Sequence, residues 1–203
     1  PDKTKVGWWK NGYPEYFAKV LNAPDWTTIR LCANGEELDL ATHVPLHFRR
    51  ELDMLRGLLT RTFEVSVGGM HLSVKAQRFC SMADVETAFL RYSVDVLDGS
   101  GSLTLEPVMD GDVTNEDANW DERFWEVNAA SGDATGGHLT VTTRKTGFQV
   151  SHAMRATAWF DSRSLEGSAL PMKHGHAVRF ECAVEAGSRC VVDKTISLLR
   201  GMD

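Results

Sequence analysis

The chain has 203 residues, of which 42% are hydrophobic and 25% are charged, and its formal net charge is −6. This length is enough for one large β domain with its own core. The acidic balance excludes nucleic acid and anionic membrane surfaces as expected partners, because both attract basic faces. No apolar stretch approaches the ~20 residues of a membrane span, and no signal-peptide pattern opens the chain. We therefore expect a soluble, cytoplasmic protein.

The first 26 residues differ from the rest in composition. They are rich in aromatic side chains and show little sustained period. We expect residues 1–26 to form an extended arm that lays its aromatic rings against another surface. Large aromatic side chains commonly anchor interfaces, so the candidate interface residues are Trp8, Trp9 and Tyr13.

Residues 27–203 show recurring strand patterns in which apolar and polar residues alternate. Asn34-Gly35 is a strong hairpin-turn signal, and Gly68-Gly69 marks a second turn. Two segments, 81–86 and 162–170, could hold a helical turn. The predicted strands are residues 29–33 with a return through Leu38 and Leu40, 70–76, 88–96, 103–105 ending at Pro107, 125–129, 139–143, 148–160, 178–184 and 190–198.

A hairpin is predicted within RRELDMLRGLLTRTFEV, residues 49–65. Phe48, Arg50, Leu52 and Met54 alternate with polar residues, which predicts a strand with one face on a core. The connection through Gly57 suits a hairpin loop with a left-handed residue. About eleven or twelve strands at a spacing of about 8–12 residues, with almost no helix, indicate one antiparallel β-sandwich domain.

Four cysteines lack a CxxC spacing: Cys32, Cys80, Cys182 and Cys190. The interpretation favoured by this pattern is that they are buried, reduced thiols in a cytosolic protein. Cys182 falls on the apolar side of an alternating run. A Cys182–Cys190 bridge across a hairpin therefore stays open as an alternative.

The acidic segment 110–126 is the most function-like part of the chain. Carboxylates and amides beside an exposed ring suit sugar recognition, while an oxygen-rich loop could hold calcium although it lacks the EF-hand order. The third interpretation is a solvated loop whose tryptophans pack on a neighbouring domain. The candidate sugar- or barrel-facing residues are Asn115, Asp117, Asn119, Trp120, Asp121 and Trp125.

Other chemistry-bearing residues have structural interpretations. Glu51 and Asp53 share a strand face, where we expect salt bridges with Arg49 or Arg61 rather than a catalytic carboxylate pair. His174 and His176 flank a glycine in a turn and lack a third metal ligand. His152 lies on an apolar register, which predicts a hydrogen-bonded core histidine. We assign no catalytic residue and no metal site.

Several long strings resemble a known family. PDKTKVGWWKNGYPEYFAKVLNAPDWTTIRL, NGEELDL, RRELDMLRGLLTRTF and DVTNEDANWDERFWE occur in this order. They resemble the N-terminal domain of glycoside hydrolase family 65, the disaccharide phosphorylases, and most of all its maltose-phosphorylase branch. The resemblance implies a β-super-sandwich of the galactose-mutarotase-like type, followed in the family by a helical linker and an (α/α)6 barrel.

Two departures from the family pattern matter. The family's initial segment, with a GNG-type turn and a GTYxAG-like strand, is not found, so we expect a sandwich that is incomplete at its N-terminus. The catalytic barrel, which carries the general acid and the phosphate-binding residues in the family, is also not found. The resemblance therefore implies a domain with no activity of its own and no cofactor.

What the resemblance implies for the parent enzyme is phosphorolysis of an α-linked glucose disaccharide, most simply maltose, with inversion and with inorganic phosphate as co-substrate. The expected partner is the parent's own catalytic barrel, and a homodimer is a second expectation. Two alternatives stay open: an autonomous carbohydrate-binding module, and a mutarotase-like enzyme with a His/Glu pair in a concave cleft.

Overall fold

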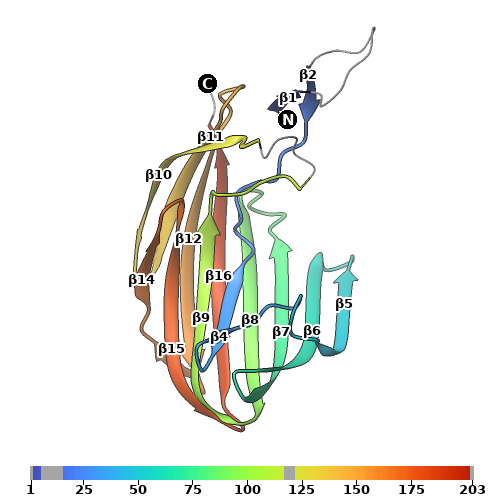
Figure 1. Ribbon diagram of the computed structural model, residues 1–203, viewed down its shortest axis with the longest axis vertical. Helices are drawn as coiled ribbons and strands as arrows, with labels where there is room; N and C mark the ends of the chain where they lie inside the picture. The colour runs from blue at the N-terminus through green and yellow to red at the C-terminus, as the bar shows by residue number, and fades with distance from the viewer. Residues whose placement is uncertain (1, 6–15, 117–121, 202–203) are drawn as a thin grey trace.

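The computed structural model describes residues 2–5, 16–116 and 122–201, and these residues form strands and turns without a helix. Two sheets stack on each other as a sandwich (Figure 1). All strand pairs in the described residues are antiparallel. The predicted all-β, antiparallel sandwich is confirmed.

The larger sheet has nine strands in the order β10-β11-β12-β16-β8-β7-β6-β5, with β13 paired to the side of β12. Its strands are β5 (Leu46–Asp53), β6 (Leu58–Val67), β7 (Met70–Cys80), β8 (Thr87–Asp98), β10 (Trp125–Asp133), β11 (Gly136–Thr143), β12 (Gln149–Phe160), β13 (Arg163–Leu165) and β16 (Arg189–Arg200).

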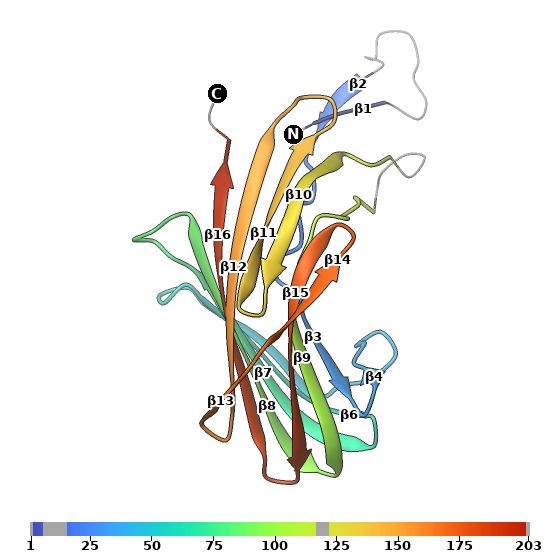
Figure 2. The same ribbon diagram turned by 90° about the vertical axis from the view of Figure 1, so that its left-hand side faces the viewer.

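The smaller sheet has five strands in the order β14-β15-β9-β3-β4. Its strands are β3 (Ile29–Ala33), β4 (Glu36–Glu37), β9 (Ser100–Asp110), β14 (Ser168–Met172) and β15 (Gly175–Glu185). The chain changes sheet at several connections, and one of them contains β13, which Figure 2 shows running from the end of β12 to β14.

The predicted arm contains a separate two-stranded sheet, formed by β1 (Asp2–Lys5) and β2 (Tyr16–Lys19). It lies at one end of the sandwich (Figure 1). Residues 6–15 lie outside the described residues, so the interface predicted for Trp8, Trp9 and Tyr13 stays a prediction.

The core lies between the two sheets and follows the period-2 alternation of the sequence. Side chains of both sheets that are at most 1% exposed meet there, since every second residue of a strand points to the same face. Examples from the larger sheet are Leu72, Val74, Val94, Val192 and Ile196, and from the smaller sheet Leu31, Leu103 and Val178.

The turn predictions are confirmed by backbone angles. Asn34 and Gly35 have φ of 49° and 82°, and Gly68 and Gly69 have φ of 58° and 74°, as a type I′ hairpin turn requires. Gly68 is needed for a second reason. A Cβ at this position would lie 1.9 Å from the carbonyl oxygen of Ala33, on β3 of the other sheet.

The predicted hairpin of residues 49–65 exists as β5 and β6, with Gly57 at a φ of 63° in its loop. The prediction that β5 has one face on the core is wrong. Every residue from Leu46 to Leu52 is exposed. The cause is the unequal width of the sheets, because β5 lies at the end of the nine-stranded sheet, beyond the strands of the smaller one (Figure 1).

The prediction that a short strand ends at Pro107 is also wrong. β9 continues through Pro107 to Asp110, in the middle of the smaller sheet. Its ladder to β15 passes from Val108 directly to Leu105, while Pro107 keeps Ile29 of β3 as a partner. Proline has no backbone N–H to donate. The missing hydrogen bond coincides with the short gap in the β9–β15 ladder between Val108 and Leu105.

Neither predicted helical turn forms. Residues 81–87 make a polar turn in which Ser81 Oγ accepts the Asp84 N–H at 2.9 Å, and residues 162–170 contain β13 and the start of β14. Ser and Asp side chains bind nearby backbone groups and so compete with helix formation. The return strand predicted through Leu38 and Leu40 is only β4, at Glu36–Glu37.

Candidate functional site

The acidic segment between β9 and β10 is held against the chain that enters β3. Asn115 Oδ1 accepts the Asn22 N–H at 3.1 Å, and Asn115 Nδ2 donates to the Val20 carbonyl at 3.0 Å. The Trp125 indole N–H donates to the Asn22 carbonyl at 2.8 Å. The polar groups of two predicted sugar-facing residues, Asn115 and Trp125, therefore already bind backbone.

The remaining predicted residues of this loop are not described. Asp117, Asn119, Trp120 and Asp121 lie outside the described residues, so their role stays a prediction. The described carboxylate Asp112 forms ion pairs with Arg123 and, at 3.4 Å, with His174 Nδ1. Within the described ranges, no group of three His, Cys, Asp or Glu side chains could hold a metal ion.

A cleft of about 1000 Å³ lies beside this segment. It is bounded by residues 20–23, by the β11–β12 hairpin and by the end of β16, and the side chain of Phe148 is 48% exposed in it. Aromatic rings next to hydroxyl and amide groups are the surface that a sugar requires. The lining residues with these groups are Trp125, Phe148, Thr142, Thr146 and Gln149. Our sequence analysis placed only Trp125 here, because the others come from a hairpin that had no loop motif.

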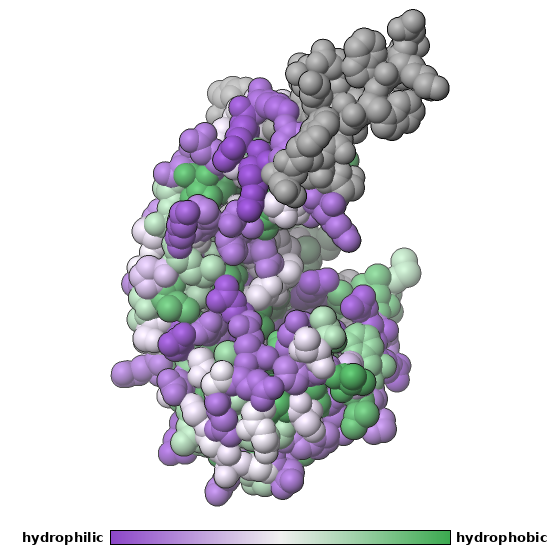
Figure 3. Space-filling model, viewed as in Figure 1, coloured by the Kyte–Doolittle hydropathy of each residue, from purple (hydrophilic) through white to green (hydrophobic). Residues whose placement is uncertain are grey.

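The second candidate surface is apolar. We define the hairpin surface as Leu46, Phe48, Leu52, Met54 and Leu55, which are between 45% and 96% exposed. In the view of Figure 3 hydrophobic residues gather on the side of the molecule where β5 lies, beyond the edge of the smaller sheet. A contiguous apolar patch on a soluble domain usually marks an interaction site.

The predictions for single side chains have mixed outcomes. Glu51 pairs with Arg49 as predicted, whereas Asp53 pairs with Arg56 at 3.7 Å. His174 and His176 do not act as a pair, since His176 is buried and its Nε2 contacts the Asp133 carbonyl at 3.0 Å.

His152 is a core residue, but it is not fully hydrogen-bonded as predicted. Its side chain is 2% exposed, and Nδ1 has no hydrogen-bond partner in the described part of the chain. Burial lowers the pKa of His152 to about 4, because a charged imidazole would lose its hydration. His152 is therefore neutral at pH 7.

The cysteines are free thiols, but only Cys190 is fully buried, and Cys80 is exposed. Cys182 on β15 and Cys190 on β16 belong to different sheets, and their Sγ atoms are 3.1 Å apart. The hydrogen bond from Cys190 lowers the pKa of Cys182. The two thiols therefore form a close contact across the interface between the sheets.

Two buried charged groups were not predicted as structural features. Lys194 is 1% exposed, donates from Nζ to the carbonyls of Thr28 and Val108, and has its pKa lowered to about 7 by burial. Glu106 is buried with Arg179 at 2.7 Å and Arg30 at 3.7 Å. The sequence signal for Lys194 was a charge on the apolar register of its strand, between Val192 and Ile196, whereas Glu106 lies off the register of Leu103 and Leu105.

These observations define an antiparallel β-sandwich domain with an exposed apolar hairpin surface and a polar cleft. The part of the chain that the structure describes contains no helix with the length and apolarity that a membrane crossing requires.

Comparison with known proteins identifies the family to which the domain belongs. The sequence model described as "Glycosyl hydrolase family 65, N-terminal domain" matches residues 1–203. The chain therefore belongs to glycosyl hydrolase family 65, of which it is an N-terminal domain.

Three curated relatives illustrate the membership. Maltose phosphorylase of Bacillus subtilis (strain 168) is 43% identical over 143 residues, which cover 70% of this chain and 19% of that protein. Kojibiose phosphorylase of Thermoanaerobacter brockii is 31% identical over 98 residues, 48% of this chain and 13% of that protein. Alpha,alpha-trehalose phosphorylase of the same species is 27% identical over 207 residues, 94% of this chain and 27% of that protein.

A solved structure described as a kojibiose phosphorylase from the human microbiome has the same fold. Its TM-score is 0.76 at 21% identity, over 89% of this chain and 23% of that chain. The matched parts span between 13% and 27% of the lengths of these relatives.

Proposed function

We propose that this chain is a non-catalytic scaffold domain of a longer disaccharide phosphorylase that resembles maltose phosphorylase. The parent enzyme would cleave an α-linked glucose disaccharide with inorganic phosphate and inversion. The observation that carries this proposal is the match of the family's N-terminal domain over residues 1–203. The 43% identity to a maltose phosphorylase supports maltose as the disaccharide.

The scaffold role is supported by the hairpin surface. Its apolar side chains are between 45% and 96% exposed. A contiguous apolar surface of this kind usually packs against a partner. In this proposal the partner is the catalytic domain of the same polypeptide. The galactose-mutarotase-like label, a homodimer and a cytoplasmic location stay predictions.

The test is a comparison of two purified proteins, the 203-residue chain and the full-length polypeptide that carries it. We expect the full-length protein to release glucose 1-phosphate from maltose and phosphate, and the 203-residue chain to release none. Release of glucose 1-phosphate by the 203-residue chain would contradict the non-catalytic role. Release of glucose without glucose 1-phosphate by the full-length protein would contradict phosphorolysis.

A second candidate function is carbohydrate binding, which the cleft beside Trp125 and Phe148 favours. Titration of the 203-residue chain with maltose, followed by tryptophan fluorescence, distinguishes the two functions. Saturable quenching that is lost in Phe148→Ala would support a binding module. For the scaffold role we expect no saturable change.

A further inference from the structure

A second cavity, of about 300 Å³, lies between the start of β3 and the larger sheet. It is open beyond the edge of the smaller sheet, on the inward face of β5, β6, β7 and β8. Strands β6, β7 and β8 each supply both apolar and polar side chains to it. The residues used below are Arg50, Arg61, Arg78, Ala76, Tyr92 and Thr28.

The strand register builds this cavity from two adjacent rows of side chains. In the first row Arg50 lies opposite Arg61, Arg61 opposite Ala76, and Ala76 opposite Tyr92. In the second row Arg78 lies between Leu59 and Leu90. Ala76 has the smallest side chain in these rows, so it leaves space between the Arg61 and Tyr92 side chains.

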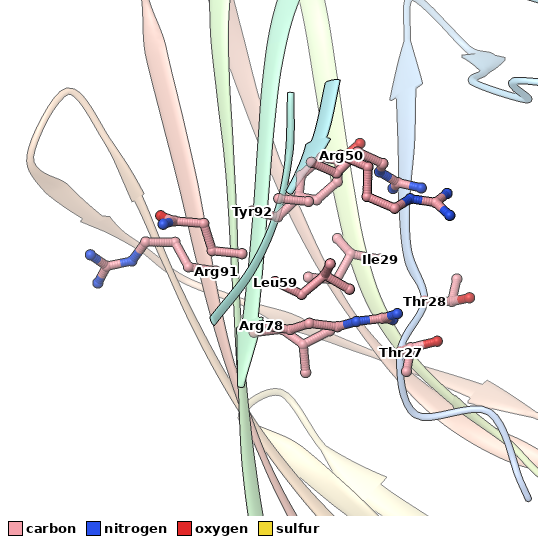
Figure 4. A pocket seen from close by; sticks show the side chains of 12 residues that line it. Thr27, Thr28, Ile29, Arg50, Leu59, Arg78, Arg91 and Tyr92 are labelled. Atoms are coloured by element: carbon pink, nitrogen blue, oxygen red, sulfur yellow. The ribbon is translucent and has the colours of Figure 1, made fainter. Parts of the chain in front are cut away.

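The three arginines have no counter-charge. In the described residues no carboxylate lies within 4.0 Å of their guanidinium groups, whereas Arg91 of the same cavity wall binds Asp193 through two hydrogen bonds of 2.7 and 2.6 Å. Figure 4 shows Arg50 and Arg78 extending toward Thr27 and Thr28, and Arg91 extending away from them.

This arrangement is unfavourable without an anion. Like charges directly opposite each other on paired strands destabilise a sheet, and Arg50 and Arg61 are such a pair. Their guanidinium carbons lie 5.8 Å and 5.6 Å from the ring centres of Phe48 and Phe63, so cation–π contacts hold them. The rings position the guanidinium groups but do not neutralise them.

Tyr92 supplies an additional hydrogen-bond donor. Its side chain is 6% exposed and lines the cavity, and in the described part of the chain its hydroxyl has no hydrogen-bond partner. Burial raises the pKa of Tyr92 to about 12, so the hydroxyl keeps its proton at pH 7. This hydroxyl opens into the cavity beside three cations, so it can donate to a ligand that accepts hydrogen bonds.

The Asp25 carboxylate, which binds Thr27 and Thr28 at the cavity, does not offset this charge. Asp25 Oδ1 accepts hydrogen bonds from the Thr27 N–H at 2.8 Å and the Thr27 hydroxyl at 3.0 Å. Thr28 also hydrogen-bonds to Asp25, and the Lys194 ammonium interacts with this carboxylate electrostatically. Arg50, Arg61 and Arg78 are not among the groups that shift the pKa of Asp25, so this carboxylate does not serve as their counter-charge.

We propose that this cavity binds a small organic oxyanion through a phosphoryl or carboxylate group. The Arg50, Arg61 and Arg78 guanidinium groups and the Tyr92 hydroxyl donate to the oxyanion, and the apolar side chains of the cavity contact the rest of the molecule. Guanidinium groups match the planar, bidentate geometry of such anions. The volume is at the small end of ligand sites. Leu52 of the hairpin surface lies opposite Leu59 in the second row, so the inference requires that the catalytic domain of the proposed function leaves this cavity open.

The test is chemical modification of arginine in the full-length polypeptide that carries this chain. Phenylglyoxal reacts with accessible guanidinium groups, and peptide mass spectrometry reads each arginine separately. The probes are inorganic phosphate and malonate, at an ionic strength held constant with sodium chloride. We expect each probe to slow modification of Arg50, Arg61 and Arg78 saturably, and to leave the exposed Arg155 on β12 unchanged.

Two variants localise the effect. Arg78→Gln should raise the anion concentration for half-protection of Arg50 and Arg61 at least tenfold, because a charge-assisted donor is lost. Lys75→Gln removes the same charge from an exposed position on the same strand, on the opposite face of the sheet, and should change nothing. Tyr92→Phe should weaken protection without removing the ring.

Three results would overturn the proposal. Unchanged protection in Arg78→Gln, or no protection by either probe, would show that the arginines do not form a site. Unreactive Arg50, Arg61 and Arg78 without any added anion would show that another segment of the polypeptide covers them. Stronger protection by phosphate assigns the phosphoryl group, and stronger protection by malonate assigns the carboxylate; both support an oxyanion site.

Discussion

At the scale of single residues, the sandwich buries charged and polar groups among its mostly apolar strands. Lys194, Glu106 and His152 are each at most 5% exposed. Lys194 and Glu106 have polar or charged partners, whereas the Nδ1 atom of His152 has none in the described residues. A buried polar group without a partner is costly, so His152 is the residue at which substitution is most informative.

His152 gives a prediction about pH. Its folded-state pKa of about 4 lies below the ordinary 6.5, so between these values the unfolded chain binds the additional proton. The free energy of unfolding is therefore unaffected by this group above pH 6.5. It falls by up to about 3 kcal/mol as the pH is lowered from 6.5 toward 4. We expect His152→Leu to lose less stability over this range than the wild type.

The measurement is the free energy of unfolding by urea at several pH values between 4 and 7. His138→Leu, at an exposed histidine on the neighbouring strand β11, is the matched control. A pH dependence of His152→Leu equal to that of the wild type would show that the buried imidazole does not contribute.

At the scale of elements, the β6–β7 turn depends on contact with the other sheet. Gly68 and Gly69 both have positive φ, but only a Cβ at Gly68 would meet the Ala33 carbonyl. We expect Gly69→Ala to cost about 1–2 kcal/mol because of its left-handed backbone. Gly68→Ala should cost at least about 2 kcal/mol more, because the two sheets must also separate there. Urea unfolding of the two variants measures this difference, and equal losses would contradict it.

The strands β15 and β16 carry the two thiols that meet between the sheets. Oxidation by glutathione disulfide should join Cys182 and Cys190, which lie on strands adjacent in sequence, and yield two equivalents of glutathione. Closing this short loop should raise the free energy of unfolding by about 2 kcal/mol. Intact mass after alkylation, together with thermal unfolding, checks the prediction. Cys182→Ser should show no gain, and a mixed disulfide with glutathione in the wild type would contradict the prediction.

The sequence was sufficient to predict elements wherever the evidence is local. Turns at Asn34-Gly35 and Gly68-Gly69 follow from backbone sterics, and the alternation in β7 and β8 predicts which residues share a face. Alternation does not say whether anything covers that face, which is why the exposure of β5 was missed. The extent of β9 was missed because the effect of Pro107 depends on which ladder loses a donor.

The candidate sites were harder to predict because their residues come together only through the register of several strand pairs. Arg50 and Arg61 are opposite each other in a hairpin whose turn was predicted, so their contact was within reach of the sequence. The position of Arg78 and Tyr92 in the adjacent rows required the registers of two more strand pairs. The cleft beside Trp125 required contact between residues 20–23 and the β11–β12 hairpin, which are far apart in sequence.

At the scale of the whole molecule, the hairpin surface predicts how this domain depends on its parent. Leu52 is 59% exposed, so Leu52→Asp should change the stability of the 203-residue chain by less than about 0.5 kcal/mol. In the full-length polypeptide the same variant should lower the melting temperature by several degrees, because a charge enters an apolar contact.

Leu97→Asp is the matched control, since Leu97 is 46% exposed near the end of β8 and is not part of the hairpin surface. Differential scanning calorimetry of both variants in both proteins makes the comparison. An equal effect of the two variants on the full-length polypeptide would show that the hairpin surface does not contact the catalytic domain.

The terminal position of β5 also leaves one of its backbone edges without a neighbouring strand among the described residues. Its main-chain N–H and C=O groups on that side could pair with a strand from a foreign chain, which is how sheets begin to aggregate. Every second residue from 49 to 53 of β5 is charged: Arg49, Glu51 and Asp53. They should deter such additions while the protein is being synthesised, before any permanent neighbour reaches it.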